Sequence, residues 1–395
     1  MLFQTLDDKN ECISVFVDGE MHSEVPMSVS RTWSYSNYLS DYDIEYAQIY
    51  CQGKTLDEVC PDHLRDSWNK TSGKLKAFIR SFQISKVNLS ENCFFDMVPV
   101  RFLHEYCAIR NKICGAVFSD FKKPDNYHHL VNAQKVLYDI KYRPMNLKMS
   151  NIRHFYHEKK ARKLIEKYHN NEAYCSFNLF GSKTGRLATN PDSFPIHNLK
   201  REYRSIIEPT NDFFIELDYN AAEARVVLGL LGKPQPKEDI HDWHAKTIYR
   251  DLLSRDEAKT RFFAWLYNPE SQDHLSNREY DRDLILERYY LDGSVNNIFN
   301  RNIECDDFHA FNYLIQSTCA DIVLDKMYNI YELLKHHRSY ITFSMHDSII
   351  IDFAKEDKYL IKEIISEFKD TKLGSFKSSI KAGINYNNLK LINLN

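Results

Sequence analysis

Residues 213–225 read FFIELDYNAAEAR, and the interpretation of the whole chain starts from this stretch. Phe213–Leu217 has the length and apolar character of a strand, which Asp218 is expected to end. A helix is predicted from Ala221 to Leu231, where a glycine and a proline stop it. A carboxylate held between a strand and a helix could ligate a metal ion, or it could be a loop or capping residue.

The composition is typical of a soluble globular protein, with 43% hydrophobic and 27% charged residues in a chain of 395. The net charge of −3 does not indicate a nucleic-acid partner, but enzymes often confine basic side chains to one groove. Lys and Arg cluster at residues 159–163, 183–186 and 200–204, and each cluster could equally be a solvated surface. The chain is long enough for two or three structural units.

Cysteine usage and hydropathy indicate the compartment. Nine cysteines without a CxxC pair predict buried or free thiols in a reducing environment. The N-terminus lacks a signal-peptide pattern, and no apolar run approaches the roughly 18 residues of a membrane span. We therefore expect a cytoplasmic protein of a bacterial or other host cell, with no membrane partner.

Residues 1–92 carry the weakest signals, and their role is left open. Asp43 and Glu45 form an Asp-x-Glu pair of the kind that exonuclease sites use for metal. No apolar strand leads into the pair, so an acidic loop is the preferred interpretation. Residues 93–176 are predicted to be mainly helical. They could form an arm that grips a duplex, or an ordinary helical subdomain.

A basic loop and a striped helix follow. Residues 177–189, FNLFGSKTGRLAT, combine glycine with Lys and Arg, which suits phosphate oxygens, although the spacing is not that of a Walker loop. Further along, Arg255, Lys259, Phe263 and Tyr267 recur every four residues and form one stripe on a helix. The cations could hold a triphosphate and the rings could stack on a base. A partly buried aromatic ridge is the alternative.

Residues 339–353, SYITFSMHDSIIIDF, predict a β-hairpin with His346 and Asp347 at its tip. This second carboxylate could share a metal site with Asp218, or it could only serve the turn. Two divalent ions bridged by the aspartates would bind a nucleoside triphosphate and activate a primer 3′ oxygen.

A long helix is predicted over residues 308–334. It places Asn312 and Gln316 four residues apart on one face, among apolar residues. Such amides could pair with a nucleic-acid strand or with a hydrogen-bond network in the core.

From about residue 173 to its C-terminus the chain resembles the polymerase domain of family A DNA polymerases, the bacterial polymerase I and phage replicative group. The resemblance implies an α+β fold with right-hand polymerase architecture: an antiparallel-sheet palm, helical fingers and thumb, and an additional N-terminal region. The expected segments are 1–92 of unknown role, 93–176 thumb-like, 177–232 first part of the palm, 233–304 short fingers, and 305–395 second part of the palm.

The two palm motifs and the fingers helix carry the implied catalytic roles. LDYNAAEAR and MHDS resemble the palm motifs, and SRDEAKTRFFAWLY resembles the fingers helix. The implied cofactor is a pair of Mg²⁺ ions, with Mn²⁺ as a substitute. The implied metal ligands are Asp218, Asp347 and the backbone carbonyl of Tyr219, and the implied catalytic residues are Asp218, Asp347 and Lys259.

The resemblance also implies which residues bind nucleotide and DNA. Glu223 matches the glutamate that crowds the sugar 2′ position and so favours deoxynucleotides. KTGRLAT resembles a duplex-contacting loop and NYLIQSTCAD a minor-groove-reading helix. The implied nucleotide-binding residues are Arg255, Lys259, Phe263, Tyr267, Glu223 and His241, and the implied DNA-binding residues are Arg186, Asn198, Asn312, Gln316 and His346.

We therefore expect a template-directed DNA polymerase of a phage or mobile replicon, with primer-template DNA and dNTPs as partners. No exonuclease is recognisable, which leaves open a separate exonuclease or processivity factor. Ser348 stands where the family usually has Glu, so a related single-subunit RNA polymerase or primase is the main alternative. Two others are a DNA-binding replication factor that has lost catalysis and a metal-dependent phosphohydrolase built on His241-Asp242 and His346-Asp347.

Overall fold

The computed structural model describes residues 4–5, 14–87 and 92–392, which form two compact units. The first unit extends to Tyr138 and the second begins at Asp139. This boundary lies within the segment expected to be thumb-like, and the finer division into palm and fingers stays a prediction. Among the described residues, no helix is both long enough and apolar enough to span a bilayer.

The first unit packs helices around short strands. Its core lies between α2 and α3, where Trp68 meets Phe102, Tyr106 and Ile109 of α3. These α3 residues recur every three or four positions, so they share one face of the helix. The strands are β1 Gln4–Thr5, β2 Val15–Val17, β3 Glu20–His22, β4 Arg31–Thr32 and β5 Glu45–Tyr46. The helices are η1 Asn37–Leu39, α1 Ala47–Tyr50, α2 Asp62–Ile84, η2 Phe94–Met97, α3 Val100–Asp120 and α4 Tyr127–Lys141, which crosses into the second unit.

Glu45 does not resemble a metal ligand in this setting. Its carboxylate accepts hydrogen bonds from Arg31 (3.2 Å), Lys123 (2.9 Å) and Tyr50 (2.8 Å). These donors lower the pKa of Glu45 although burial opposes them. The arrangement supports the interpretation of residues 41–46 as a structural acidic segment.

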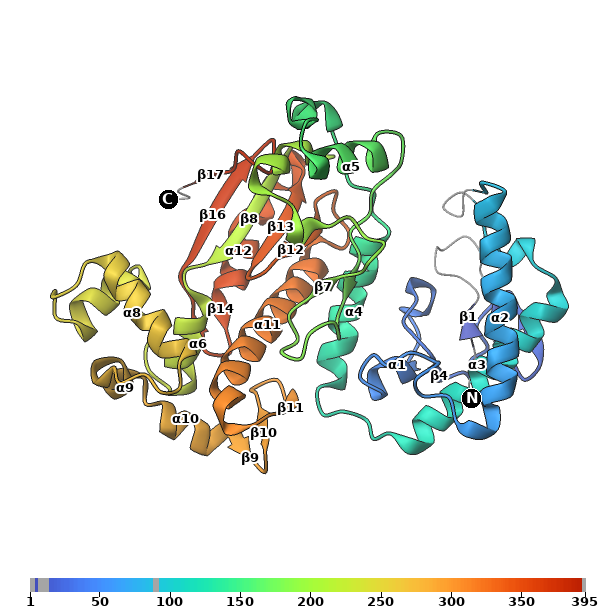
Figure 1. Ribbon diagram of the computed structural model, residues 1–395, viewed down its shortest axis with the longest axis horizontal. Coiled ribbons are helices and arrows are strands. Elements are labelled where there is room, and N and C mark those ends of the chain that lie inside the picture. The colour runs from blue at the N-terminus through green and yellow to red at the C-terminus, as the bar shows by residue number, and fades with distance from the viewer. Residues whose placement is uncertain (1–3, 6–13, 88–91, 393–395) are drawn as a thin grey trace. The chain divides into compact units, whose positions relative to one another are not determined.

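The second unit is organised by a five-stranded sheet in the order β12-β13-β8-β16-β17 (Figure 1). All of its strand pairs are antiparallel. The central strand β8, Phe213–Tyr219, buries Phe214, Ile215 and Leu217, and all residues of β13, Ser348–Phe353, are buried. Hydrophobic residues on both faces explain the near-continuous apolar runs in the sequence. The other strands of the sheet are β12 Tyr340–Met345, β16 Ser378–Gly383 and β17 Lys390–Leu391.

Helices surround this sheet. The long helix α11, Asp307–Leu334, contacts α6, α12 and the β12–β13 hairpin, and it runs alongside the sheet in Figure 1. Asp306 caps α11, and Ser254 with Glu257 forms a capping box at the start of α8. The helices are η3 Met149–Phe155, α5 Lys159–Tyr168, η4 Ile196–Asn198, η5 Arg201–Ile206, α6 Ala222–Leu230, α7 Ile240–Trp243, the π-helical turn η6 His244–Ile248, α8 Arg255–Tyr267, α9 His274–Tyr280, α10 Arg282–Tyr289, η7 Lys355–Leu360 and α12 Ile361–Lys369. The short strands outside the main sheet are β6 Phe177–Asn178, β7 Ala188–Thr189, β9 Tyr290–Leu291, β10 Ser294–Asn296, β11 Asn302–Glu304, β14 Asp370–Thr371 and β15 Gly374–Ser375.

The cysteines correct one expectation. Cys93 is disulfide-bonded, and Cys12 lies outside the described residues. Spacing along the chain could not show which thiols the fold brings together. Free thiols are found, as expected, at Cys51, Cys60, Cys107, Cys114, Cys175, Cys305 and Cys319.

Candidate active site

Strand pairing brings the two candidate catalytic carboxylates together. Asp218 of β8 pairs with Ser348, the residue that follows Asp347 in the β12–β13 turn. On its other side, Asp218 pairs with Ser379 of β16. Extended partners on both sides keep the backbone regular, so β8 continues to Tyr219 and the expectation that Asp218 ends the strand is wrong.

Both carboxyl groups are hard to ionise without a counter-ion. Burial raises the pKa of Asp218 to about 6, with further contributions from Glu216 and Asp347, while Lys381 opposes the rise. Burial also raises the pKa of Asp347, opposed by Arg186. Two nearby carboxyl groups that both favour protonation provide a suitable environment for a cation.

The donor chemistry fits a hard divalent ion with few protein ligands. Among the described residues, no three His, Cys, Asp or Glu side chains come together as a metal site. Mg²⁺ commonly uses one or two carboxylates and takes its other ligands from water and substrate phosphates. Tyr219 follows Asp218 directly, and its ring is fixed by stacking on Phe368 (4.1 Å). Its carbonyl therefore lies on a rigid strand, directly after Asp218.

Ser348 serves the hairpin. It is buried, and its hydroxyl donates to the carbonyl of Met345 at 2.9 Å. Its own carbonyl accepts from the hydroxyl of Ser344 at 3.1 Å. His346, the first turn residue, is exposed and has a φ of 54°. These contacts fix the turn that carries Asp347.

The KTGR loop is held against a buried ion pair. Gly185 has a φ of +76°, and a Cβ there would lie 2.6 Å from Cζ of Arg301. Arg301 in turn donates to both carboxylate oxygens of the fully buried Asp321, at 2.8 and 2.7 Å. Glycine is strongly favoured here because it lacks the Cβ that would meet Arg301 and because it adopts this φ without strain. The result is a fixed position for Arg186.

Arg186 links the loop to the candidate sugar gate. Its Nη2 donates to Glu223 Oε1 at 2.7 Å, and the hydroxyl of Tyr267 donates to Glu223 Oε2. Glu223 is 7% exposed, so it needs these donors. Arg186 also lowers the pKa of Asp347 against the effect of burial. Burial raises the pKa of Cys319 on α11, and both Asp347 and Glu223 add to that rise. Glu223 and Asp347 therefore lie in the same part of the candidate active site.

The predicted stripe is present on α8. Phe263 stacks on Tyr267, with ring centroids 5.9 Å apart and an interplanar angle of 10°. Lys259 is exposed, and Tyr267 is 44% exposed. Burial lowers the pKa of His241 to about 4, and Arg255 and Lys259 contribute to the lowering. His241 therefore lies beside the basic end of the stripe.

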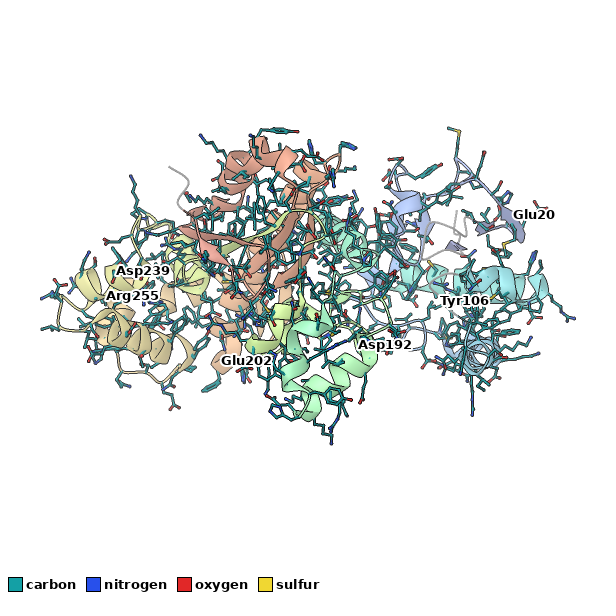
Figure 2. All side chains as sticks on the ribbon, turned by 90° about the horizontal axis from the view of Figure 1, so that it is seen from above. Glu20, Tyr106, Asp192, Glu202, Asp239 and Arg255 are labelled. Atoms are coloured by element: carbon teal, nitrogen blue, oxygen red, sulfur yellow. The ribbon has the colours of Figure 1, made fainter. Side chains whose placement is uncertain are left out.

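Arg255 has a partner that sequence reasoning missed. Its guanidinium donates to both oxygens of Asp239, at 3.1 and 2.9 Å (Figure 2). Asp239 also caps α7 by accepting from the backbone N–H of His241 (2.9 Å) and Asp242 (3.2 Å). These donors hold the pKa of the Asp239 carboxyl well below its usual range, although burial opposes them. The capping position of Asp239 before a short helix was the available signal.

The candidate DNA-contacting residues are less connected. Asn198 is exposed at the end of η4. Gln316 donates to Asn312 at 2.8 Å, so their amides pair with each other. The ring of His346 stacks on that of His197 at 5.4 Å. His197, another residue that sequence reasoning missed, bonds the carbonyl of Ser344 in the hairpin at 3.1 Å.

No family model matches the chain. A curated relative is the DNA polymerase I of Caldicellulosiruptor bescii, 25% identical over 247 residues. The match covers 49% of this chain and 29% of the relative, so the chain spans less than a third of that protein.

A solved structure shares the fold. It is the POL domain of Pol1 from M. smegmatis in complex with a DNA primer-template and dNTP, at a TM-score of 0.59 and 13% identity. The match covers 73% of this chain and 76% of that one. The predicted α+β polymerase architecture is therefore confirmed, and the match to a DNA polymerase I agrees with the resemblance to the polymerase domain of family A DNA polymerases.

Proposed function

We propose that the chain is a template-directed DNA polymerase that adds deoxynucleotides to a primer 3′ end. The observation that carries this proposal is the pairing of β8 with the β12–β13 hairpin, which brings Asp218 beside Asp347. The relative's name and the DNA and dNTP bound by the structural neighbour agree with it.

The chain's own side chains would prepare the reactants. Lys259 and Arg255 would bind the triphosphate, with Arg255 exchanging part of its contact with Asp239 for phosphate oxygens. Phe263 would lie against the base, and Glu223 would crowd the sugar 2′ position. Holding the primer 3′ oxygen near the α-phosphate of the bound nucleotide would lower the activation barrier of nucleotide addition.

Two divalent ions, Mg²⁺ or Mn²⁺, would be held by Asp218, Asp347 and the Tyr219 carbonyl. When bound they would favour deprotonation of the primer 3′ hydroxyl and stabilise the leaving pyrophosphate. Primer and template would be positioned by Arg186, Asn198, Asn312, Gln316 and His346. We further propose replication of a phage or mobile element without proofreading by this chain, with a separate exonuclease or processivity factor as a candidate partner.

An RNA polymerase or primase remains the second candidate because of Ser348. Its hydroxyl is engaged by the turn, so the residue has a local structural reason to be serine. Sugar choice would then depend on Glu223. Loss of catalysis is disfavoured because Asp218, Asp347, Arg255 and Lys259 are all present.

Primer extension with Mg²⁺ on a primed DNA template tests the proposal. We expect extension with dNTPs, little with rNTPs, and none with excess EDTA. A mismatched primer end should be extended slowly and not excised. Extension with rNTPs alone would favour the RNA polymerase, and no extension with either set would refute polymerisation.

A further inference from the structure

A pocket lined by lysines lies between the α6–α7 loop and the β14–β15 hairpin. The pocket has a volume of about 560 Å³, which is in the range of small-ligand sites. Residues 233–237 form one wall, and Leu373 to Ser378 with Lys369 form the other. None of the residues assigned above to metal, nucleotide or DNA lines it.

The charge of the lining is one-sided. Four lysines line the pocket: Lys233, Lys237, Lys369 and Lys377. Only the ammonium of Lys233 has a carboxylate partner among the described residues, Glu279 at 2.6 Å. No Asp or Glu is among the described residues that line it. A group of lysines around one concavity, three of them without a carboxylate partner among the described residues, attracts anions.

Two polar atoms in the lining also lack partners. Oε1 of Gln235 and Oγ of Ser378 are buried and make no hydrogen bond among the described residues. A buried polar atom without a partner is costly, so a ligand or a water molecule would be expected there. The hydroxyl of Ser378 can donate to an oxyanion, whereas Oε1 of Gln235 can accept only from a protonated or hydrated group.

The walls are rigid before any ligand binds. The guanidinium of the buried Arg225 donates to the carbonyls of Pro236 (2.9 Å) and Glu238 (3.1 Å). The amide of Gln235 donates to the carbonyls of Arg225 (2.9 Å) and Leu373 (3.1 Å). The loop and the hairpin are thus tied together, and a ligand would not need to order them.

The chemistry of the lining selects the kind of anion. Phe376, the one aromatic residue among the described lining, is 1% exposed, so it offers no face on which a base could stack. Lysines act as point charges toward phosphate oxygens. We propose that this pocket binds the phosphate groups of a polyanion, either a free polyphosphate or the backbone of a DNA strand.

The test uses the full chain in EDTA, so that metal-dependent nucleotide binding does not contribute. Inorganic triphosphate is titrated by calorimetry, and a labelled oligothymidylate by fluorescence anisotropy. The variant is Lys237→Glu with Lys377→Glu, both exposed side chains. The control is Lys358→Glu with Lys362→Glu, which are also exposed and change the net charge equally.

We expect the pocket variant to weaken binding of at least one probe by about tenfold or more, and the control to leave it within about twofold. For the oligonucleotide, the salt dependence should fall by about two counter-ions. Loss of triphosphate binding alone assigns the pocket to a free polyphosphate, and loss of oligonucleotide binding alone assigns it to a DNA strand. Ser378→Ala should weaken the same binding without lowering the unfolding midpoint, because the hydroxyl it removes has no protein partner.

Absence of binding by both probes would overturn the proposal, as would equal loss in the two double variants. It would also fail if Lys259→Ala abolished triphosphate binding while the pocket variant kept binding of both probes, since the nucleotide site would then be the site observed. Because the readout is binding, the result does not depend on whether the chain polymerises DNA.

Discussion

Replacing Tyr267 by Phe removes one of two donors to the Glu223 carboxylate and leaves the stacked ring in place. A hydrogen bond to a charged group contributes about 1.5–3 kcal/mol. Tyr267 is 44% exposed, so water can replace part of the lost donor, and the low end, about 1.5 kcal/mol, applies. Arg186 still holds the other oxygen at 2.7 Å. The Glu223 carboxylate should therefore be held less firmly but should keep its position beside Arg186.

Two measurements follow from that magnitude. Urea unfolding should show a loss of about 1.5 kcal/mol, and the ratio of kcat/KM for rNTPs over dNTPs should rise by up to about tenfold. Tyr359→Phe is the control, because Tyr359 of η7 is 66% exposed and its hydroxyl contacts, among the described residues, only the imidazole of His337, at 3.3 Å, and no carboxylate. It should change stability by less than about 0.5 kcal/mol. Identical stability and sugar preference in wild type and Tyr267→Phe would refute the role of this hydrogen bond.

Three further outcomes are expected. Phe263→Tyr should improve dideoxynucleotide incorporation in single-nucleotide assays, and no improvement would mean that α8 is misaligned with the family. Arg301→Met should lower the free energy of unfolding in urea by about 3–5 kcal/mol, because it leaves the charge of the Asp321 carboxylate unpaired. Adding Asp321→Leu should restore much of that stability, and a double variant as unstable as Arg301→Met would refute the description as a buried charge pair. Burial lowers the pKa of His244 to about 3, so the stability contributed by its neutral form is lost as pH falls below about 6.5, and from pH 6 to 5 this residue should contribute a loss of about 1 kcal/mol. The loss measured over that range should be smaller by about that amount in His244→Gln, with the rest due to other groups such as His241, and equal slopes in the two proteins would refute the assignment.

Local sequence features predicted the framework well. The apolar runs around His346-Asp347 fix a hairpin because strand residues and a two-residue turn are recognisable over a short range. The four-residue spacing from Arg255 to Tyr267 gave one helix with the expected stripe. The limits of β8 were less predictable, because pairing on both sides carried the strand past Asp218.

Long-range partners could not be predicted from spacing. Glu223 and Arg186 are 37 residues apart, and nothing in either motif shows that they form an ion pair. The same holds for Arg301 and Asp321, whose burial explains Gly185. The pocket of four lysines depends on two segments 138 residues apart at Gln235 and Leu373. These ion pairs and this pocket depend on how distant segments pack together, which local sequence patterns do not predict.

Single-nucleotide incorporation by Asp218→Asn and Asp347→Asn tests the central claim most directly. With Mg²⁺, a primed template and the correct dNTP, we expect each variant to lose at least about 10³-fold in rate, because removing a metal ligand forfeits several kcal/mol of transition-state stabilisation. Duplex binding, measured in the same preparations by anisotropy, should stay within about threefold of wild type, since the substitutions are isosteric and leave the DNA-contacting side chains in place. Incorporation by either variant at the wild-type rate would contradict the assignment of this carboxylate pair as the catalytic centre.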